Sequence, residues 1–222
     1  MIRQCIILCG GYAKRMYPYT KETAKSMLLI NDRPFIDYQL RLLKKYGVTS
    51  IILCTSHLAW QIRDYIKNGD LWKLRVKYVH DEHQLGTGGA VYKARDYMYS
   101  NFFVWYGDSY CDTDLSNIHS DFKSRAIVFK NSDKYDPSKI MLKGDKVVRY
   151  DKNGCGSYID VFYAFNKNDL LSVLRSECDL SDALVELIKL KKLYAYKISE
   201  RFYEIGKKEG YDEFKKAMGD SS

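Results

Sequence analysis

The sequence predicts an α/β fold in which helices cover a mostly parallel sheet. Short apolar runs that are typical of buried strands alternate with longer segments whose apolar residues recur at helical spacing. Glycines or a carboxylate follow three of these runs, as in sheets whose ligands lie beyond the carboxyl ends of the strands. A chain of 222 residues with 46% hydrophobic residues suits one domain with a substantial core.

The first half of the chain alternates between strands and helices. Ile6-Ile7-Leu8-Cys9 is uniformly apolar, and 102–106 is too apolar for a half-exposed strand. Asp32-Arg33-Pro34 is typical of a helix start with proline at the first helical position. We therefore expect strands at 6–9, 51–54, 75–80 and 102–106, and helices at 35–47, 58–66 and 90–98.

The second half has a more mixed pattern. Lys143-Gly144-Asp145 predicts a hairpin turn between two short strands. Leu184, Leu187 and Ile188 mark the inner face of a helix. We expect strands at 126–129, 157–165, 193–198 and 202–205, and helices at 168–175, 182–190 and 209–218. With three prolines and no Ser/Gly-rich run, we draw no domain boundary within 1–222.

Composition narrows the classes of partner. The net charge of +8 and the pI near 9.0 favour anions, but lysines and arginines are scattered and largely balanced by acids, which argues against nucleic acid. No apolar run approaches the roughly 20 residues that span a bilayer, so we expect a cytoplasmic protein with no membrane partner. The six cysteines form no Cys-x-x-Cys pair, which favours free thiols over disulfides or a zinc site.

Two features point to phosphate chemistry. Gly10 and Gly11 follow the first strand, and the cations Arg15 and Lys25 nearby could neutralise phosphoryl oxygens, although an ordinary tight turn is the alternative. Asp108 follows five bulky apolar residues and a glycine, where a carboxylate needs a partner. Mg2+ would satisfy it, because this ion accepts one or two carboxylates and keeps water and phosphate as its other ligands. The alternative is a cap on the next turn.

Several segments together resemble the sugar-1-phosphate nucleotidyltransferases. The segment from Leu8 to Met16 resembles their Gly-rich signature, and Ala24-Lys25-Ser26-Met27-Leu28 is similar to their Pro-Lys-Pro-Met-Leu. Further similar segments follow in the family's order: Pro34 to Leu40, Leu85-Gly86-Thr87-Gly88-Gly89-Ala90, Tyr106-Gly107-Asp108 and Arg201 to Gly206. The resemblance implies a Rossmann-like three-layer α/β/α fold, with a nucleotide-binding half at about 1–110 and a sugar-binding half at about 111–222.

The resemblance also implies a reaction and its residues. The anomeric phosphate of a sugar 1-phosphate would attack the α-phosphorus of a nucleoside triphosphate and release pyrophosphate. Arg15 would hold the β and γ phosphates, Lys25 the α-phosphate, and Asp108 with Glu204 would hold Mg2+. The implied nucleotide-binding residues are Leu8, Gly10, Gly11, Arg15, Gly86, Thr87 and Gly88. The implied sugar-phosphate-binding residues are Asp151, Lys152 and Asp160, the first two having a solvated hairpin end as their alternative.

The chain departs from the family pattern in its opening loop. Ala13 and Lys14 stand where the family has glycine and a small hydroxyl residue, so this loop could be shaped differently or carry an extra cation. Ala24 and Ser26 replace two prolines, which should leave Lys25 less rigidly presented. These departures, together with Glu204 in place of aspartate, leave open a nucleotide-binding protein without catalysis.

The substrate can be narrowed only by similarity. Phe162 falls near a glycine of the relatives and either narrows the acceptor pocket or belongs to the core; Glu204 has a structural role as its alternative. In length the chain resembles the short members, which guanylylate D-glycero-D-manno-heptose 1-phosphate, uridylylate N-acetylmuramate 1-phosphate or cytidylylate phosphocholine. The heptose enzymes are the most similar, which implies GTP, surface polysaccharide synthesis and a monomer or homodimer.

Overall fold

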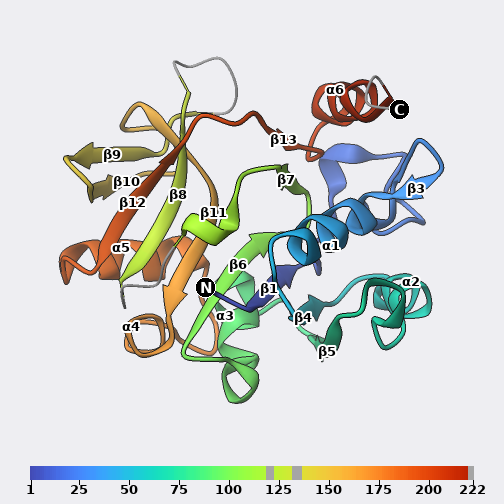
Figure 1. Cartoon of the computed structure of the whole chain (residues 1–222), viewed down its shortest axis with the longest axis horizontal. Helices are drawn as coiled ribbons and strands as arrows, with labels where there is room; N and C mark the ends of the chain where they lie inside the picture. Colours follow the sequence, from blue (N-terminus) through green and yellow to red (C-terminus); the bar gives the residue numbers. More distant parts are fainter. Residues whose placement is uncertain (119–122, 132–136, 220–222) are drawn as a thin grey trace.

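The computed structural model describes residues 1–118, 123–131 and 137–219. Its largest element is a nine-stranded sheet with the order β5-β4-β1-β6-β11-β8-β12-β10-β9 (Figure 1). Its strands are β1 (Gln4–Leu8), β4 (Ser50–Thr55), β5 (Arg75–His80), β6 (Asn101–Tyr106), β8 (Ser124–Lys130), β9 (Ile140–Lys143), β10 (Lys146–Tyr150), β11 (Tyr158–Asn166) and β12 (Leu193–Ile198). Two small pairs lie outside it, β2 (Leu29–Ile30) with β3 (Arg33–Pro34) and β7 (Ser109–Cys111) with β13 (Phe202–Glu204). The helices are α1 (Phe35–Lys45), α2 (Ala59–Ile66), α3 (Gly86–Lys93), α4 (Lys167–Leu171), α5 (Leu180–Lys189) and α6 (Lys208–Gly219).

The first half of the chain forms the parallel part of the sheet, with β1 between β4 and β6 and β5 outside β4. Leu8 is level with both Cys54 and Tyr106, and Thr55 is level with His80. Parallel strands of one sheet end at the same edge, so the loops after β1, β5 and β6 meet there. The predicted convergence of these three loops is confirmed.

The second half continues the same sheet in mixed orientation. β11 runs antiparallel to β6, with Tyr163 opposite Val104, and β8 and β12 are parallel to each other. β9 and β10 form the predicted hairpin, whose Gly144 has a φ of +66° that favours glycine. The α/β fold class is confirmed, with the parallel pairs concentrated among β1, β4, β5 and β6.

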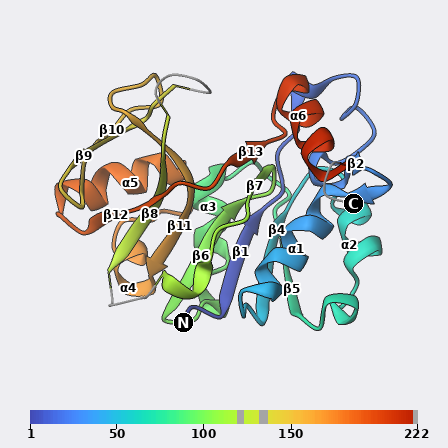
Figure 2. The same cartoon turned by 45° about the horizontal axis from the view of Figure 1, so that its top comes forward.

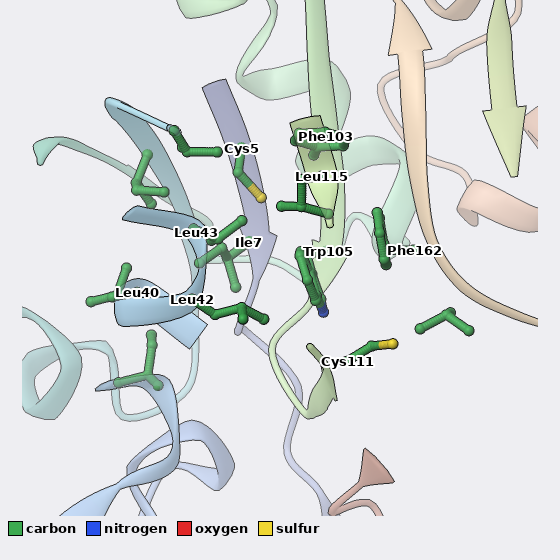
Figure 3. Close-up of a cluster of buried hydrophobic side chains, with 14 of the residues drawn as sticks. Cys5, Ile7, Leu40, Leu42, Leu43, Phe103, Trp105, Cys111, Leu115 and Phe162 are labelled. Atoms are coloured by element: carbon green, nitrogen blue, oxygen red, sulfur yellow. The ribbon is translucent and has the colours of Figure 1, made fainter. Parts of the chain in front are cut away.

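The sheet separates two hydrophobic layers, one on each of its faces. Cys5 and Ile7 pack on one face with α1 and α2, and this cluster also holds the stacked rings of Trp105 and Phe162 (Figure 3). Ile6, between them in sequence, faces the other way, where α3, α4 and α5 pack (Figure 2). This alternation follows from the two-residue period of a strand and gives the predicted three-layer α/β/α arrangement.

A third, smaller cluster fixes the end of the chain beside its beginning. Phe214 of α6 is fully buried and contacts the ring of Phe35 edge-on at 5.1 Å, while Met16 and Ile205 complete the cluster. The Tyr211 hydroxyl donates to the Leu29 carbonyl at 2.7 Å. These contacts bring the segment after β13 against the opening loop, far from it in sequence.

Several predicted boundaries need correction. α3 begins at Gly86, four residues before the predicted helix, so its glycines lie inside the helix. Pro34 is the residue before α1 and not its first helical residue. α4 ends at Leu171, well short of 175, whereas α5 begins at Leu180, where the side chains of Asp179 and Asp182 form a capping box.

All six cysteines are free thiols, as predicted. Within the described parts of the chain, no helix is long and apolar enough to cross a membrane.

Candidate active site

A cavity of about 350 Å3 lies where β1, β5 and β6 end. It is bounded by the loop after β1, the start of α3 and the segment around Lys25. The cavity brings together most of the residues predicted for the nucleotide and for catalysis: Leu8, Gly10, Gly11, Lys25, Gly86, Thr87 and Asp108. Segments that are separated in sequence therefore form one site.

The opening loop depends on close backbone packing. A β-carbon on Gly10 would lie 3.0 Å from the Ser56 β-carbon, so a side chain here would push this loop from the one after β4. Ala13 has a φ of 50°, in the left-handed region, which explains why glycine suits this position in relatives. The Thr20 hydroxyl holds the Ala13 carbonyl at 2.8 Å. The loop therefore keeps a left-handed turn despite the alanine, while the exposed Lys14 lies over the Tyr12 ring.

Lys25 begins a short 3-10 turn, Lys25–Met27, at the cavity wall. The Gln61 side chain of α2 holds the preceding residues from both sides, because it accepts from the Ala24 amide at 2.8 Å and donates to the Glu22 carbonyl at 2.7 Å. These two hydrogen bonds, the Gln61 clamp, restrain the segment before Lys25. They act against the loose presentation of Lys25 that the missing prolines led us to expect.

Two carboxylates and two cations converge beside Gly206. A β-carbon on Gly206 would lie 3.0 Å from Glu204 Oε1, 3.4 Å from Asp108 Oδ2 and 3.6 Å from an Arg15 terminal nitrogen. Lys25 Nζ forms an ion pair with the same Asp108 oxygen. A β-carbon here would press on the Glu204 carboxylate, so glycine leaves the charged ends of these side chains room to approach one another.

The pairing of β7 with β13 positions the two carboxylates. Glu204 lies opposite Ser109, and the Ile205 amide donates to the Asp108 carbonyl at 2.9 Å. Two converging carboxylates at a phosphate-sized cavity fit Mg2+, which draws its other ligands from water and phosphate. No group of three or more His, Cys, Asp or Glu side chains in the described residues forms a fuller metal site.

Arg15 and Gly88 are the two predicted nucleotide residues that do not line the cavity; Arg15 lies beside Gly206, and Gly88 packs against another segment. The Gly88 amide donates to the Cys178 carbonyl at 2.9 Å. A β-carbon on Gly88 would lie 2.6 Å from Cys178 Sγ and 3.0 Å from the Asp179 backbone. The small size of Gly88 thus lets α3 pack directly on the residues before α5.

The predicted sugar-side residues do not line the cavity but differ in their distance from it. Lys152 forms a 2.7 Å ion pair with Asp179, which is itself a cavity residue. Asp151 instead accepts from the Asn153 amide at 2.9 Å, as expected for the alternative of a hairpin end. Lys152 therefore reaches the rim of the site, whereas Asp151 organises the turn beside it.

Asp160 lies behind the cavity wall. Its side chain is only 3% exposed, it accepts from the Tyr163 hydroxyl, and Lys139 Nζ is 3.9 Å away. Tyr106, a cavity residue, is its neighbour: burial raises the Tyr106 pKa well above the ordinary value, and the charge of Asp160 raises it further. A ligand would meet Asp160 only past this tyrosine.

Phe162 is a core residue and does not line the cavity. It is fully buried and stacks on Trp105 with ring centres 4.3 Å apart. The buried thiols of Cys9 and Cys54 border the cavity, and burial raises the Cys54 pKa to about 12. Such thiols are protonated at neutral pH and act as apolar wall.

Several residues of the cavity wall were not predicted. Asp81 comes directly after β5, and its carboxylate accepts from the amides of His83 and Leu85, both at 3.2 Å, which shapes the loop before α3. Its position at the end of a strand, before a glycine-containing loop, was the signal that could have found Asp81. The other missed wall residues are Ser26, Thr55, Ser56, Gln84 and Asp179.

Comparison with known proteins places this site in a family. A D-glycero-alpha-D-manno-heptose 1-phosphate guanylyltransferase from Campylobacter jejuni subsp. jejuni serotype O:2 is 28% identical, with 95% of this chain and 98% of the relative covered. An enzyme of the same name from Aneurinibacillus thermoaerophilus is 26% identical, with coverages of 97% and 98%.

Solved structures show that the fold of this chain is shared with other proteins. HddC from Yersinia pseudotuberculosis superposes with a TM-score of 0.82 at 23% identity, covering 98% of this chain and all of that one. The inositol-1-phosphate CTP transferase from T. maritima gives a TM-score of 0.86 at 19% identity, with coverages of 98% and 95%. A family model described as nucleotidyl transferase matches residues 4–138, which is more than half of the chain. The prediction that the chain is a nucleotidyltransferase is thereby confirmed, and the chain belongs to the nucleotidyl transferase family.

Proposed function

We propose that this enzyme joins GTP to D-glycero-D-manno-heptose 1-phosphate and releases pyrophosphate, for surface polysaccharide synthesis. The observation that supports the reaction is the convergence beside Gly206 of Arg15 and Glu204 with Asp108, which lines the cavity together with its ion-pair partner Lys25. The choice of substrates is supported by two guanylyltransferases of that name, each matched over at least 95% of both chains.

The charges of these four side chains suit phosphoryl transfer. An oxygen of the sugar phosphate attacks the α-phosphorus while the bond from that phosphorus to the bridging oxygen of pyrophosphate breaks. Negative charge then accumulates on oxygens that Lys25 and Arg15 can neutralise, provided that Lys25 leaves its ion pair with Asp108. Asp108 and Glu204 would hold Mg2+, which supplies further charge neutralisation when bound.

The remaining walls suit the rest of the substrates. Glycine backbone at Gly10, Gly11 and Gly86 gives the nucleotide close access, and Thr87 lies beside it. Lys152, at the cavity rim through Asp179, would bind the phosphate of the acceptor.

The test is pyrophosphate release with each of the four ribonucleoside triphosphates and a panel of sugar 1-phosphates, in the presence of Mg2+. GTP with the heptose phosphate should be the fastest pair. If UTP or CTP, or a hexose, N-acetylmuramate or phosphocholine acceptor, gave a faster reaction, the nucleotidyltransferase class would stand and the proposed substrates would be wrong.

Asp108→Asn separates an enzyme from a nucleotide-binding protein without catalysis. Because the change removes a carboxylate from the reacting end, turnover should fall by roughly a hundredfold or more while the fold persists. Binding of triphosphate by the unaltered protein without any pyrophosphate release from the panel would favour the binding protein.

A further inference from the structure

Ser26 lies at the cavity wall with an unused hydrogen-bonding group. Its side chain is 3% exposed, and Oγ has no hydrogen-bond partner among the residues that the structure describes. Buried hydroxyls without partners are rare, because burial removes the water that would otherwise satisfy them. Of the buried side-chain atoms in the described ranges that share this condition, Ser26 Oγ alone belongs to a residue of the cavity wall.

The surroundings of Ser26 indicate what could satisfy it. It is the residue directly after Lys25, whose ammonium group lies beside Asp108 at the reacting end of the cavity. The turn is held by the Met27 amide, which donates to the Ala24 carbonyl at 2.7 Å, and by the Gln61 clamp. Ser26 is therefore fixed next to the ammonium group that would neutralise phosphate.

We propose that Ser26 donates a hydrogen bond to a phosphoryl oxygen of the bound triphosphate. Phosphoryl oxygens only accept, and serine supplies one donor, so the two match without any other change of partner. Because Oγ is buried in the structure, it meets the phosphoryl oxygen after a rotation of the hydroxyl about χ1, which has three staggered positions. The inference rests on the proposed function, because it assumes a triphosphate in this cavity.

The experiment compares Ser26→Ala with the unaltered full-length protein. A thermal-shift screen with the four ribonucleoside triphosphates and Mg2+ first identifies the one that stabilises the unaltered protein. Calorimetric titration with a non-hydrolysable analogue of that triphosphate then gives both dissociation constants. Ser26→Ala should bind the analogue about tenfold more weakly, as expected for the loss of a hydrogen bond to a charged group. Its unfolding temperature without ligand should be unchanged or higher, because a buried unpaired hydroxyl has gone.

Ser181→Ala is a matched control. Ser181 is also buried at 8% exposure, and its Oγ also has no partner among the described residues, but it does not line the cavity. This variant should therefore leave the affinity unchanged. Ser26→Cys, of similar size with a weak donor, should lie between the serine and alanine proteins and serves if the alanine variant does not fold.

The outcomes are distinct. Equal affinity of Ser26→Ala and the unaltered protein, in a protein that does bind a triphosphate, would overturn the role of Ser26 and leave the proposed function intact. An unaltered protein that binds none of the triphosphates would overturn both. A lower unfolding temperature of Ser26→Ala at unchanged affinity would assign its hydroxyl to the protein's own stability.

Discussion

Replacing Gly88 with alanine separates a packing role from a ligand-binding role for the glycines of α3. The added β-carbon would lie 2.6 Å from Cys178 Sγ and 3.0 Å from the Asp179 backbone, so the Cys178 side chain must turn and the helix must shift by a few tenths of an ångström. Such overpacking costs about 1–3 kcal/mol. Alanine recovers about 0.5–1 kcal/mol through its better helix propensity. The centres of these two ranges leave a net loss of about 1 kcal/mol, or roughly 2–4 °C in unfolding temperature for a chain of this length.

Gly11→Ala is the corresponding change inside the cavity. No atom lies within 4 Å of its β-carbon, so stability should be unaltered, whereas the methyl group intrudes where the triphosphate would lie. Gly88→Ala should therefore lower the midpoint of urea denaturation and leave the KM for the triphosphate unchanged. Gly11→Ala should raise this KM and leave the midpoint unchanged. An unchanged denaturation midpoint for Gly88→Ala, accompanied by a higher KM, would refute the packing argument and return Gly88 to the nucleotide site.

Two further predictions concern the core and the alkaline range. Phe162→Ala should lower the free energy of unfolding by about 3–5 kcal/mol, because it removes the ring stacked on Trp105, without widening the choice of acceptor; a broader acceptor range at unchanged stability would assign Phe162 to the pocket. The buried Cys54 thiol keeps its proton to about pH 12, whereas the unfolded chain loses it near 9.0, so stability should fall as pH rises through this interval. Cys54→Ala should flatten part of that fall in denaturation midpoints measured at successive pH values, and an identical slope would contradict the prediction.

Local patterns predicted most of the fold for identifiable reasons. Leu8 and Tyr106 end strands that were predicted from apolar runs, and His80 ends one that was predicted from alternation. Strands that alternate with helices form parallel sheets whose ends coincide, so the meeting of three loops followed from order alone. The start of α3 was misplaced because glycine is a poor helix former. The contacts that make it suitable at Gly88 come from residues 90 positions later in the chain.

The residues of the candidate site also differ in whether a local pattern or a distant contact reveals them. Residues that follow a strand directly, such as Gly10 and Asp108, were found because strand ends mark the site of a sheet. Glu204 could be placed beside Asp108 only by resemblance, since the pairing of β13 with β7 that joins them is a contact between segments far apart in the sequence. Asp81 also stands at a strand end but follows no long apolar run, and it was overlooked.

The sequence by itself determined the order of strands and helices, the loops that carry glycine and charge, and the nucleotidyltransferase class. Only the tertiary structure decided which side chains line the cavity. Ser26 and Ser181 are both buried serines with unused hydroxyls, yet only one lies at the cavity wall. Likewise Phe162 belongs to the core because Trp105 on another strand covers its face. Burial and partnership depend on contacts between distant segments, and hydrophobic periodicity within one segment carries no information about them.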